Sequence, residues 1–315
     1  MHTINFLYGD SMLSNKIETL LSVAEHRNIT RAAEELSLTQ PAASRHIKLL
    51  EDEIGAPLFV RGRDGLKLTP QGEIAVKYAR RFKSLNEKML LEIKNFEKHI
   101  SVLRVGITHT SESNLTAEAL AKYGSEKSGT KIILFTDTIN NLYDMLGNYE
   151  IDLAVVDGSF SDPRYNSMLL DTDCLMCIMA TNNPLAKKGV VTLSDLKKQK
   201  MILRTPSSAT RKLFDSTLES NNVSVGDFNI MLEVDNIATI KDLIRKNLGV
   251  SILPGSACMD EIKKGKITAL PIENLSMVRE TKIIYNKDFA NTDLLSDIIK
   301  TYRSLGIKQS NHSRF

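Results

Sequence analysis

The chain has few cysteines, no long apolar run and no leader-like segment. Its 315 residues contain three cysteines, Cys174, Cys177 and Cys258, a small and odd number that suits a reduced compartment better than a disulfide framework. No apolar run is long enough to cross a bilayer, and no basic stretch followed by an apolar run and a cleavage site opens the chain. We therefore expect a cytoplasmic protein.

Signatures of enzymes, cofactors and metal sites are also missing. The sequence has no HExxH, GxSxG, GxGxxG or P-loop motif. Cys174 and Cys177 have CxxC spacing, but there is no second pair and no nearby histidine, and DCLMCIMA is typical of a buried strand. The formal net charge is only +3, too small for a non-specific polyanion binder. The sequence thus predicts no enzyme, no cofactor and no metal site, and its length predicts several domains.

The stretch TRAAEELSLTQPAASRHIKLLEDEI predicts two short helices joined by a tight turn. Thr30 can cap the first helix, and Thr39 can cap the second, with Pro41 in the first turn where a missing N–H is tolerated. The second helix carries an apolar stripe at spacings of four, three and four, formed by Ala43, Ile47, Leu50 and Ile54. The opposite face of this helix carries a set of polar residues, namely Gln40, Ser44, Arg45 and Lys48.

That polar set has the chemistry of a duplex-reading face. Gln pairs bidentately with adenine, Arg with guanine, and Ser or Lys holds a base edge or a phosphate. An ordinary solvated helix face is the alternative for any one of these residues. A basic hairpin follows, because segments 58–63 and 66–69 flank Asp64-Gly65, a strong turn signal, and carry Arg61, Arg63 and Lys67. Such a wing can grip the backbone of a neighbouring groove.

The segment AAEELSLTQPAASRHIKLLEDEIGAPLFVRGRDGLKLTPQG resembles the winged helix-turn-helix of LysR-type transcriptional regulators. That pattern runs AA, L, SQPA, S, I, LE, LG, LF, R, LT and G, and this chain departs from it at Thr39, where Ser is usual, and Ala43, where Val is usual. The resemblance implies a regulator that binds operator DNA, with RNA polymerase as a candidate partner. The predicted DNA-binding residues are Thr30, Arg31, Gln40, Pro41, Ser44, Arg45, Lys48, Arg61 and Arg63.

A long helix with one apolar seam is predicted over residues 71–100. Its apolar residues recur at spacings of three and four: Ile74, Tyr78, Phe82, Leu85, Met89, Ile93, Phe96 and Ile100. At about 1.5 Å per residue the helix reaches on the order of 40 Å, too far to bury the seam on a head of this size. We expect the same helix of a second subunit to cover it, and packing on the chain's own C-terminal domain is the alternative. The resemblance implies homodimers that assemble further into homotetramers.

The rest of the chain alternates short apolar runs with helical stretches. Strands at 103–108, 131–136 and 152–158, with helices near 115–123 and 139–148, predict a βαβαβ unit with a parallel sheet. By resemblance, residues 101–308 form a two-lobed effector domain of the type II periplasmic-binding-protein shape. The implied lobes and crossing strands are lobe I at about 101–174 and 282–308, lobe II at about 175–281, and strands near 174–180 and 278–285.

The predicted fold class is therefore α/β, with a mostly helical winged head, a linker helix and two lobes. We assign the head to residues 14–70 and the linker to 71–100. Residues 1–13 show no helical periodicity and are either an arm or a mis-assigned start, with Met12 as the alternative first residue.

Polar residues at corners, the points where a predicted strand ends and a helix begins, predict the effector site. In open α/β sheets, anions bind where strand ends meet helix N-termini. The residues assigned on this basis are Thr108, His109, Thr110, Thr136, Asp137, Ser207, Ser208, Thr210 and Asn236. Helix capping is the alternative for each one alone. The run from Ser207 to Arg211 resembles a Ser-Gly-Thr-Arg loop of some LysR-type domains, with Ala209 in place of glycine.

Two functions fit these features. The first is a transcriptional regulator that responds to a small carboxylate or oxyanion. The second is a two-lobed small-molecule-binding protein or enzyme with an accessory DNA-binding head; the absence of an export signal and of a catalytic constellation weighs against it.

Overall fold

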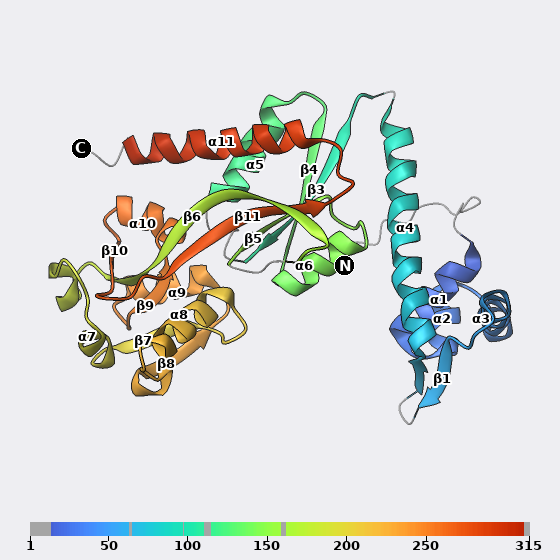
Figure 1. Cartoon of the computed structure of the whole chain (residues 1–315), viewed down its shortest axis with the longest axis horizontal. Coiled ribbons are helices and arrows are strands. Elements are labelled where there is room, and N and C mark those ends of the chain that lie inside the picture. Colours follow the sequence, from blue (N-terminus) through green and yellow to red (C-terminus); the bar gives the residue numbers. More distant parts are fainter. Residues whose placement is uncertain (1–13, 63–64, 97, 110–114, 159–161, 312–315) are drawn as a thin grey trace. The chain divides into compact units, whose positions relative to one another are not determined.

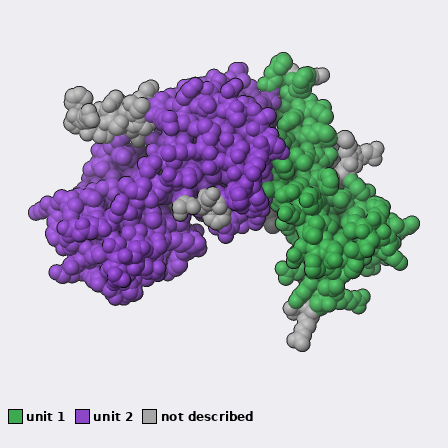
Figure 2. Space-filling view, in the orientation of Figure 1, with its two compact units in different colours: residues 1–99, 147–150 green, residues 100–146, 151–315 purple. Residues whose placement is uncertain are grey.

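A computed structural model of the chain describes residues 14–62, 65–96, 98–109, 115–158 and 162–311. The predicted arm at 1–13 and the residues Arg63, Asp64 and Thr110 lie outside this range. The chain divides into two compact units, residues 1–99 with 147–150 and residues 100–146 with 151–315, which are coloured separately in Figure 2.

The first unit is a winged helix-turn-helix followed by one long helix. Its elements are α1 (Asn15–His26), α2 (Ile29–Glu35), α3 (Gln40–Ile54), β1 (Phe59–Gly62), β2 (Gly65–Leu68) and α4 (Pro70–Phe96). Strands β1 and β2 pair antiparallel, as the wing prediction requires. The head packs around the buried side chains Leu20, Val23, Ala32, Ile47, Leu50, Leu58, Val76 and Ala79.

Two local predictions in the head are wrong. Asn28, not Thr30, caps α2: its side-chain oxygen accepts from the backbone N–H groups of Thr30 and Arg31, so Thr30 lies inside the helix. Both residue types can cap a helix, and the extended backbone of Asn28 decides the position. Ile54, assigned to the core stripe of α3, is 48% exposed because the head ends before the last turn of this helix. The cap of α3 by Thr39 is confirmed.

Three polar contacts close the head around the wing. The Glu51 carboxylate at the end of α3 accepts from the backbone N–H of Leu58 at 2.7 Å, which ties α3 to the start of the wing. The Thr69 hydroxyl donates to the Pro57 carbonyl at 2.6 Å and accepts from the Gly72 N–H at 2.9 Å, where it begins α4. A Cβ on Gly72 would lie 2.1 Å from the Leu58 carbonyl oxygen, so this position requires glycine.

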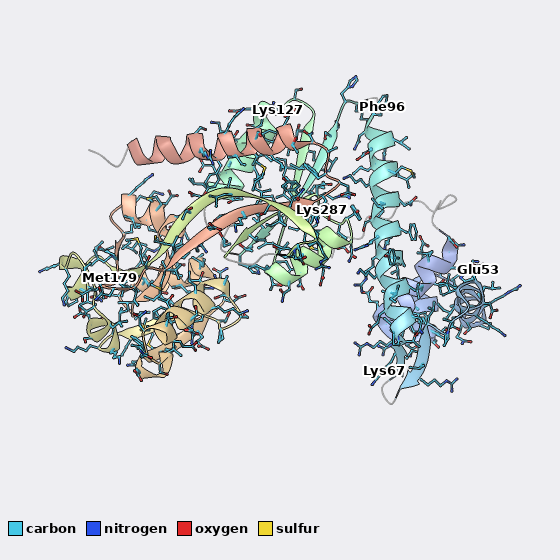
Figure 3. The ribbon with its side chains drawn as sticks, viewed as in Figure 1. Glu53, Lys67, Phe96, Lys127, Met179 and Lys287 are labelled. Atoms are coloured by element: carbon cyan, nitrogen blue, oxygen red, sulfur yellow. The ribbon has the colours of Figure 1, made fainter. Side chains whose placement is uncertain are left out.

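Helix α4 leaves its apolar seam uncovered. We use "apolar seam" for Ile74, Tyr78, Phe82, Leu85, Met89, Ile93 and Phe96, whose exposed fractions run from 37% for Met89 to 79% for Phe96. Figure 3 shows Phe96 projecting from the end of the helix. The helix ends at Phe96, earlier than the predicted 100, and His99 with its positive φ of 50° belongs to the turn that follows.

The second unit is an α/β domain with two lobes (Figure 1). The elements of lobe I are β3 (Ser101–Thr108), α5 (Leu115–Glu126), β4 (Thr130–Asp137), α6 (Ile139–Gly147), β5 (Leu153–Asp157) and, at the C-terminal end, α11 (Thr292–Asn311). The elements of lobe II are α7 (Leu193–Lys197), β7 (Lys200–Arg204), α8 (Ala209–Ser220), β8 (Asn229–Val234), α9 (Ile237–Arg245), β9 (Ser251–Pro254), α10 (Met259–Lys263) and β10 (Ile267–Leu270), with short 3-10 turns at Pro184–Lys187, Val225–Asp227 and Ser256–Cys258. Two long strands, β6 (Tyr165–Ala180) and β11 (Val278–Asn286), run through the junction.

Strand pairing explains the two-lobed shape. In lobe I the order is β4–β3–β5–β11–β6, with β3 parallel to both β4 and β5, which confirms the predicted parallel unit. The first part of β6 pairs with β11, and its second part pairs with β9 and β10 of lobe II. Strand β7 pairs in parallel with β8 and exchanges backbone bonds with Val250, just before β9.

Separate cores stabilise the lobes. In lobe I, α5 and α11 pack on one face of the sheet and α6 covers the other. Lobe II has its own clusters, built from residues such as Met179, Phe214 and Ile240. Strand β6 begins at Tyr165, earlier than the predicted 174. Among the described residues no helix is long and apolar enough to span a membrane.

Candidate DNA-binding face and effector site

The outward face of α3 carries the predicted reading residues. Gln40, Pro41, Arg45 and Lys48 are exposed, and Ser44 is half-buried. The Gln40 amide donates to the Ser44 hydroxyl at 2.9 Å, a contact between successive helical turns that holds the amide along the face. The buried stripe of Ala43, Ile47 and Leu50 lies on the opposite side, so the face can contact a ligand without disturbing the core.

The remaining head residues extend this surface. Thr30 and Arg31 are exposed in the first turn of α2, and Arg61 is exposed on β1 of the wing. Lys67, labelled in Figure 3, is exposed on β2 and is the register neighbour of Val60. Gly65 has a φ of 111°, and a Cβ there would lie 2.7 Å from the Arg27 carbonyl, so the wing approaches the α1–α2 turn at a position that only glycine fits.

In the second unit, most predicted effector residues bond locally. Ser208 caps α8 by accepting from the Arg211 N–H at 3.2 Å, and Asn236 caps α9 by accepting from Thr239 at 3.1 Å. The Asp137 carboxylate accepts from the Asn141 amide at 2.7 Å at the start of α6. Capping thus accounts for Ser208 and Asn236, and a side-chain bond to the first turn of α6 accounts for Asp137.

The other predicted effector residues differ in exposure. His109, Thr136 and Ser207 are exposed, whereas Thr108 and Thr210 are buried. The Thr108 hydroxyl donates to the Asp157 carboxylate at 2.6 Å. The Thr210 hydroxyl, 1% exposed, has no hydrogen-bond partner within the described part of the chain.

Two buried arginines near these corners were not found by sequence reasoning. Arg204 ends β7 and is 3% exposed; Arg279 lies near the start of β11 and is 4% exposed. Burial lowers the pKa of Arg204, the contact with Asp235 opposes this, and the positive charge of Arg279 lowers it further. The available signal was a cation embedded in each apolar strand, MILR and VRETKII.

Two carboxylates flank Arg279 and are themselves well bonded. Asp157 accepts from the hydroxyls of Thr108 and Thr281, and Asp173 accepts from the Ser256 hydroxyl at 2.6 Å. Their oxygens lie 3.4 Å and 3.8 Å from Nη2 of Arg279, close enough to balance its charge. Within the described segments, however, no guanidinium nitrogen of Arg279 makes a hydrogen bond.

The lobes approach each other at the same place. Gly158 follows β5 of lobe I with a φ of 113°, and a Cβ on it would lie 3.8 Å from the Cβ of Ala209 at the start of α8 in lobe II. Gly158 also donates its N–H to the Glu280 carbonyl, next to Arg279. Strand ends from both lobes and the N-terminus of α8 therefore meet beside the buried arginines.

Arg211 in the same region has a structural role. Its Nη1 donates to the Arg204 carbonyl at 3.2 Å and to Glu233 at 2.7 Å, and its Nε donates to Asp215 at 2.8 Å. These bonds join α8 to β7 and β8 and confirm that Arg211 supports the fold.

The three cysteines differ in exposure. Cys174 is exposed, whereas Cys177 and Cys258 are buried, and burial raises the pKa of each buried thiol to about 12. No cluster of three or more His, Cys, Asp or Glu side chains suited to a metal ion occurs among the residues described.

A winged helix-turn-helix with a two-lobed α/β ligand-binding domain defines the class of ligand-responsive, DNA-binding transcriptional regulators. Residues 14–73 match the profile described as "Bacterial regulatory helix-turn-helix protein, lysR family", and residues 98–305 match "LysR substrate binding domain". The chain therefore belongs to the LysR family of transcriptional regulators.

Relatives and solved structures agree with this assignment. The chain is 28% identical to a "Probable RuBisCO transcriptional regulator" of Phaeodactylum tricornutum, covering 87% of this chain and 90% of that protein. It is 27% identical to an uncharacterized HTH-type transcriptional regulator of Methanocaldococcus jannaschii, covering 86% and 91%. The fold is similar to CbnR complexed with its target DNA, with a TM-score of 0.66, 17% identity and coverage of 92% and 98%. A full-length OxyR from Pseudomonas aeruginosa gives a TM-score of 0.61, 20% identity and coverage of 93% and 98%.

Proposed function

We propose that this regulator binds operator DNA through the outward face of α3, with the wing on the adjacent backbone. The observation that carries this proposal is the exposed polar face of α3 opposite a buried stripe. Gln40, Ser44 and Arg45 have the chemistry to read base edges in a major groove. Thr30, Arg31, Pro41, Lys48, Arg61 and Arg63 complete the proposed DNA-binding set.

Arginine variants separate base reading from backbone contact. Arg45→Ala should weaken operator binding by about 1–3 kcal/mol and relax specificity, because a base contact is lost. Arg61→Ala should weaken binding to all duplexes alike and reduce the salt dependence. Arg245→Ala, the same change at an exposed position of the effector domain, is the control and should bind like the parent.

These outcomes are measured by fluorescence anisotropy with the upstream DNA of the regulator's own gene and with a scrambled duplex. Operator affinity unchanged in Arg45→Ala would contradict the proposed orientation of α3. Parent protein that binds both duplexes equally at every salt concentration would contradict the assignment of this DNA as the operator.

We further propose that the apolar seam of α4 pairs with the same helix of a second subunit. The support is the exposure of seven consecutive seam residues on one side of a helix. Two heads joined in this way would read two half-sites, and two such dimers would form the tetramer expected from the family. In this proposal the protein acts in the cytoplasm and touches RNA polymerase at the promoter.

The second domain is proposed to sense a small carboxylate or oxyanion at the junction of the lobes. Strand ends and helix N-termini of both lobes meet there, which favours a negative ligand. The proposed neighbours of the ligand are Thr108, His109, Thr110, Thr136, Asp137, Ser207, Ser208, Thr210 and Asn236. Because the lobes are joined by β6 and β11, a ligand that binds one lobe arrangement better than another would shift the spacing of the heads.

Capping and ligand binding predict different outcomes at Ser208. A residue that only caps α8 lowers the melting temperature when changed to Ala and leaves the effector midpoint unchanged. A residue that also contacts the effector raises the midpoint in a reporter assay and leaves DNA binding intact. Thr217→Ala serves as the matched control. It removes a hydroxyl on the same helix that donates to the Leu213 carbonyl.

A further inference from the structure

We propose that Arg204 and Arg279 together bind the oxyanion group of the effector, a carboxylate, sulfate or phosphate. This inference rests on the proposed function of the second domain and assigns the chemistry of its ligand. It differs from the hydroxyl corners deduced from the sequence, because both arginines lie in strands.

Unused hydrogen-bond donors are the first argument. A guanidinium carries five N–H groups in a rigid fork. In the described residues, Nε, Nη1 and Nη2 of Arg279 and Nε and Nη1 of Arg204 are buried without a hydrogen-bond partner. Native proteins rarely leave such groups unsatisfied, since each costs free energy when removed from water. Acceptor oxygens of a ligand would satisfy several of them at once.

Proximity is the second argument. Gly158 donates its N–H to the Glu280 carbonyl next to Arg279, and a Cβ on it would lie 3.8 Å from Ala209 at the start of α8. Helix α8 is in turn bonded to the Arg204 carbonyl through Arg211. The charge of Arg279 accordingly lowers the pKa of Arg204. An anion that contacts both guanidinium groups would reduce the repulsion between them. Thr210, whose buried hydroxyl also lacks a partner in the described chain, is in the first turn of α8, where the helix dipole adds to the positive potential.

The surrounding carboxylates limit the charge of the ligand. Asp157 and Asp173 lie 3.4 Å and 3.8 Å from Nη2 of Arg279 and accept hydrogen bonds from hydroxyls, but in the described part of the chain the guanidinium donors of Arg279 have no hydrogen-bond partner. Asp235 bonds Arg204 at 3.1 Å from a side chain that is 65% exposed. Two arginines face three carboxylates here, so the junction is rich in donors without an excess of positive charge, which favours one compact oxyanion over a highly charged ligand.

The variant that tests the site with the least disturbance of the fold is Arg204→Met. Its described partner, Asp235, is largely solvated, so removing Arg204 leaves no buried carboxylate unpaired. Removing one member of an ion pair is destabilising when it leaves a buried charge uncompensated, and the solvated carboxylate of Asp235 avoids that cost. The ligand-free variant should therefore melt at or above the temperature of the parent, whereas a purely structural role for Arg204 predicts a lower melting temperature.

The experiment follows melting temperature of the full-length protein against inorganic sulfate, inorganic phosphate and succinate, with chloride keeping the ionic strength constant. We expect a saturable rise in the parent with at least one probe, since a ligand that binds only the folded state stabilises it. In Arg204→Met the half-saturating concentration should increase about ten- to a hundredfold, because the variant loses a charge-assisted hydrogen bond to the ligand. Arg204→Lys, which keeps the charge but not the fork, should fall between them.

Arg245→Met is the matched control. It removes the same charge from an exposed position of lobe II and should keep the parent's midpoint. Sulfate and phosphate also stabilise folded proteins in general, because they are excluded from protein surfaces. A rise in melting temperature that does not saturate and is equal in every variant would reflect this general effect and would count against the site.

Two results would overturn the proposal: equal midpoints in the parent and Arg204→Met, or no saturable rise in the parent with any of the three probes. Neither result touches the proposed DNA-binding function, which the anisotropy assay tests separately. Which probe binds best distinguishes a carboxylate effector from a sulfate or phosphate one.

Discussion

The apolar seam of α4 gives the most direct test of assembly. Changing Leu85 and Met89 to Lys places two charges per chain in the middle of the seam. Both side chains are exposed in the single chain, 44% for Leu85 and 37% for Met89, so the substitutions should leave the fold of the monomer intact. In a dimer paired through the seam, the same positions lie at the interface.

The expected magnitude follows from the exposed surface. Fully burying a Leu or Met side chain contributes about 1.5–3 kcal/mol, so burying roughly 40% of each contributes about 0.6–1.2 kcal/mol. Four such side chains in a dimer then account for about 2–5 kcal/mol, which raises the dissociation constant roughly thirty- to several-thousand-fold. Desolvation of four ammonium groups adds to this loss.

Sedimentation velocity over a range of concentrations measures the effect, with circular dichroism to verify helix content. Glu87→Lys is the control: it changes the charge by the same two units per chain and lies opposite the seam on an exposed position. The control should stay as associated as the parent. A double variant that sediments like the parent would refute pairing through this seam and favour the effector domain as the dimer contact.

Three further predictions concern other parts of the chain. Gly72→Ala should destabilise the head by about 1–3 kcal/mol, because the added Cβ would lie 2.1 Å from a backbone carbonyl, and chemical denaturation followed by near-UV circular dichroism would show it. The pKa of Asp195 is lowered to about 2 by bonds from a lysine and from the capping Thr192, so its contribution to stability is complete above the unfolded pKa near 4 and is lost as the pH falls toward 2. The melting temperatures of Asp195→Asn and the parent should therefore differ at pH 7 and converge at about pH 2. At neutral pH a thiol reagent should label Cys174 rapidly and the two buried cysteines only on unfolding, and rapid labelling of all three would contradict their burial.

Elements with a strong period were predictable, and elements that depend on distant partners were not. The three-four spacing of α4 and the alternation of apolar runs with helices gave their positions within a few residues, because these patterns reflect burial along one element. The first half of β6 was missed. Its sequence, YNSMLLDTD, mixes polar and apolar residues, and it becomes a strand only through antiparallel pairing with β11, more than a hundred residues later.

The same distinction applies to the residues of the candidate sites: some follow from one element, and others depend on distant strands. The reading face of α3 follows from one helix and could be assigned from spacing. In the effector domain, Ser208 and Asn236 cap helices, and a role of the assigned residues in ligand binding stays a prediction. Arg204 and Arg279 could not be paired from the sequence, because only the fold of β7 and β11 brings their charges together.

The position of Arg279 links the proposed ligand to movement of the lobes. Arg279 lies opposite Asp173 in the β6–β11 pairing, next to the point where β6 changes partners from β11 to β9. Asp173 in turn accepts from Ser256, which follows β9 of lobe II. An anion held by Arg279 and Arg204 would therefore join the crossing strands to lobe II through donors that have no hydrogen-bond partner among the described residues. A ligand shifts a conformational equilibrium only by its difference in affinity between the two states. In this domain that difference would come from donors that both lobes present together only when the junction has the right spacing.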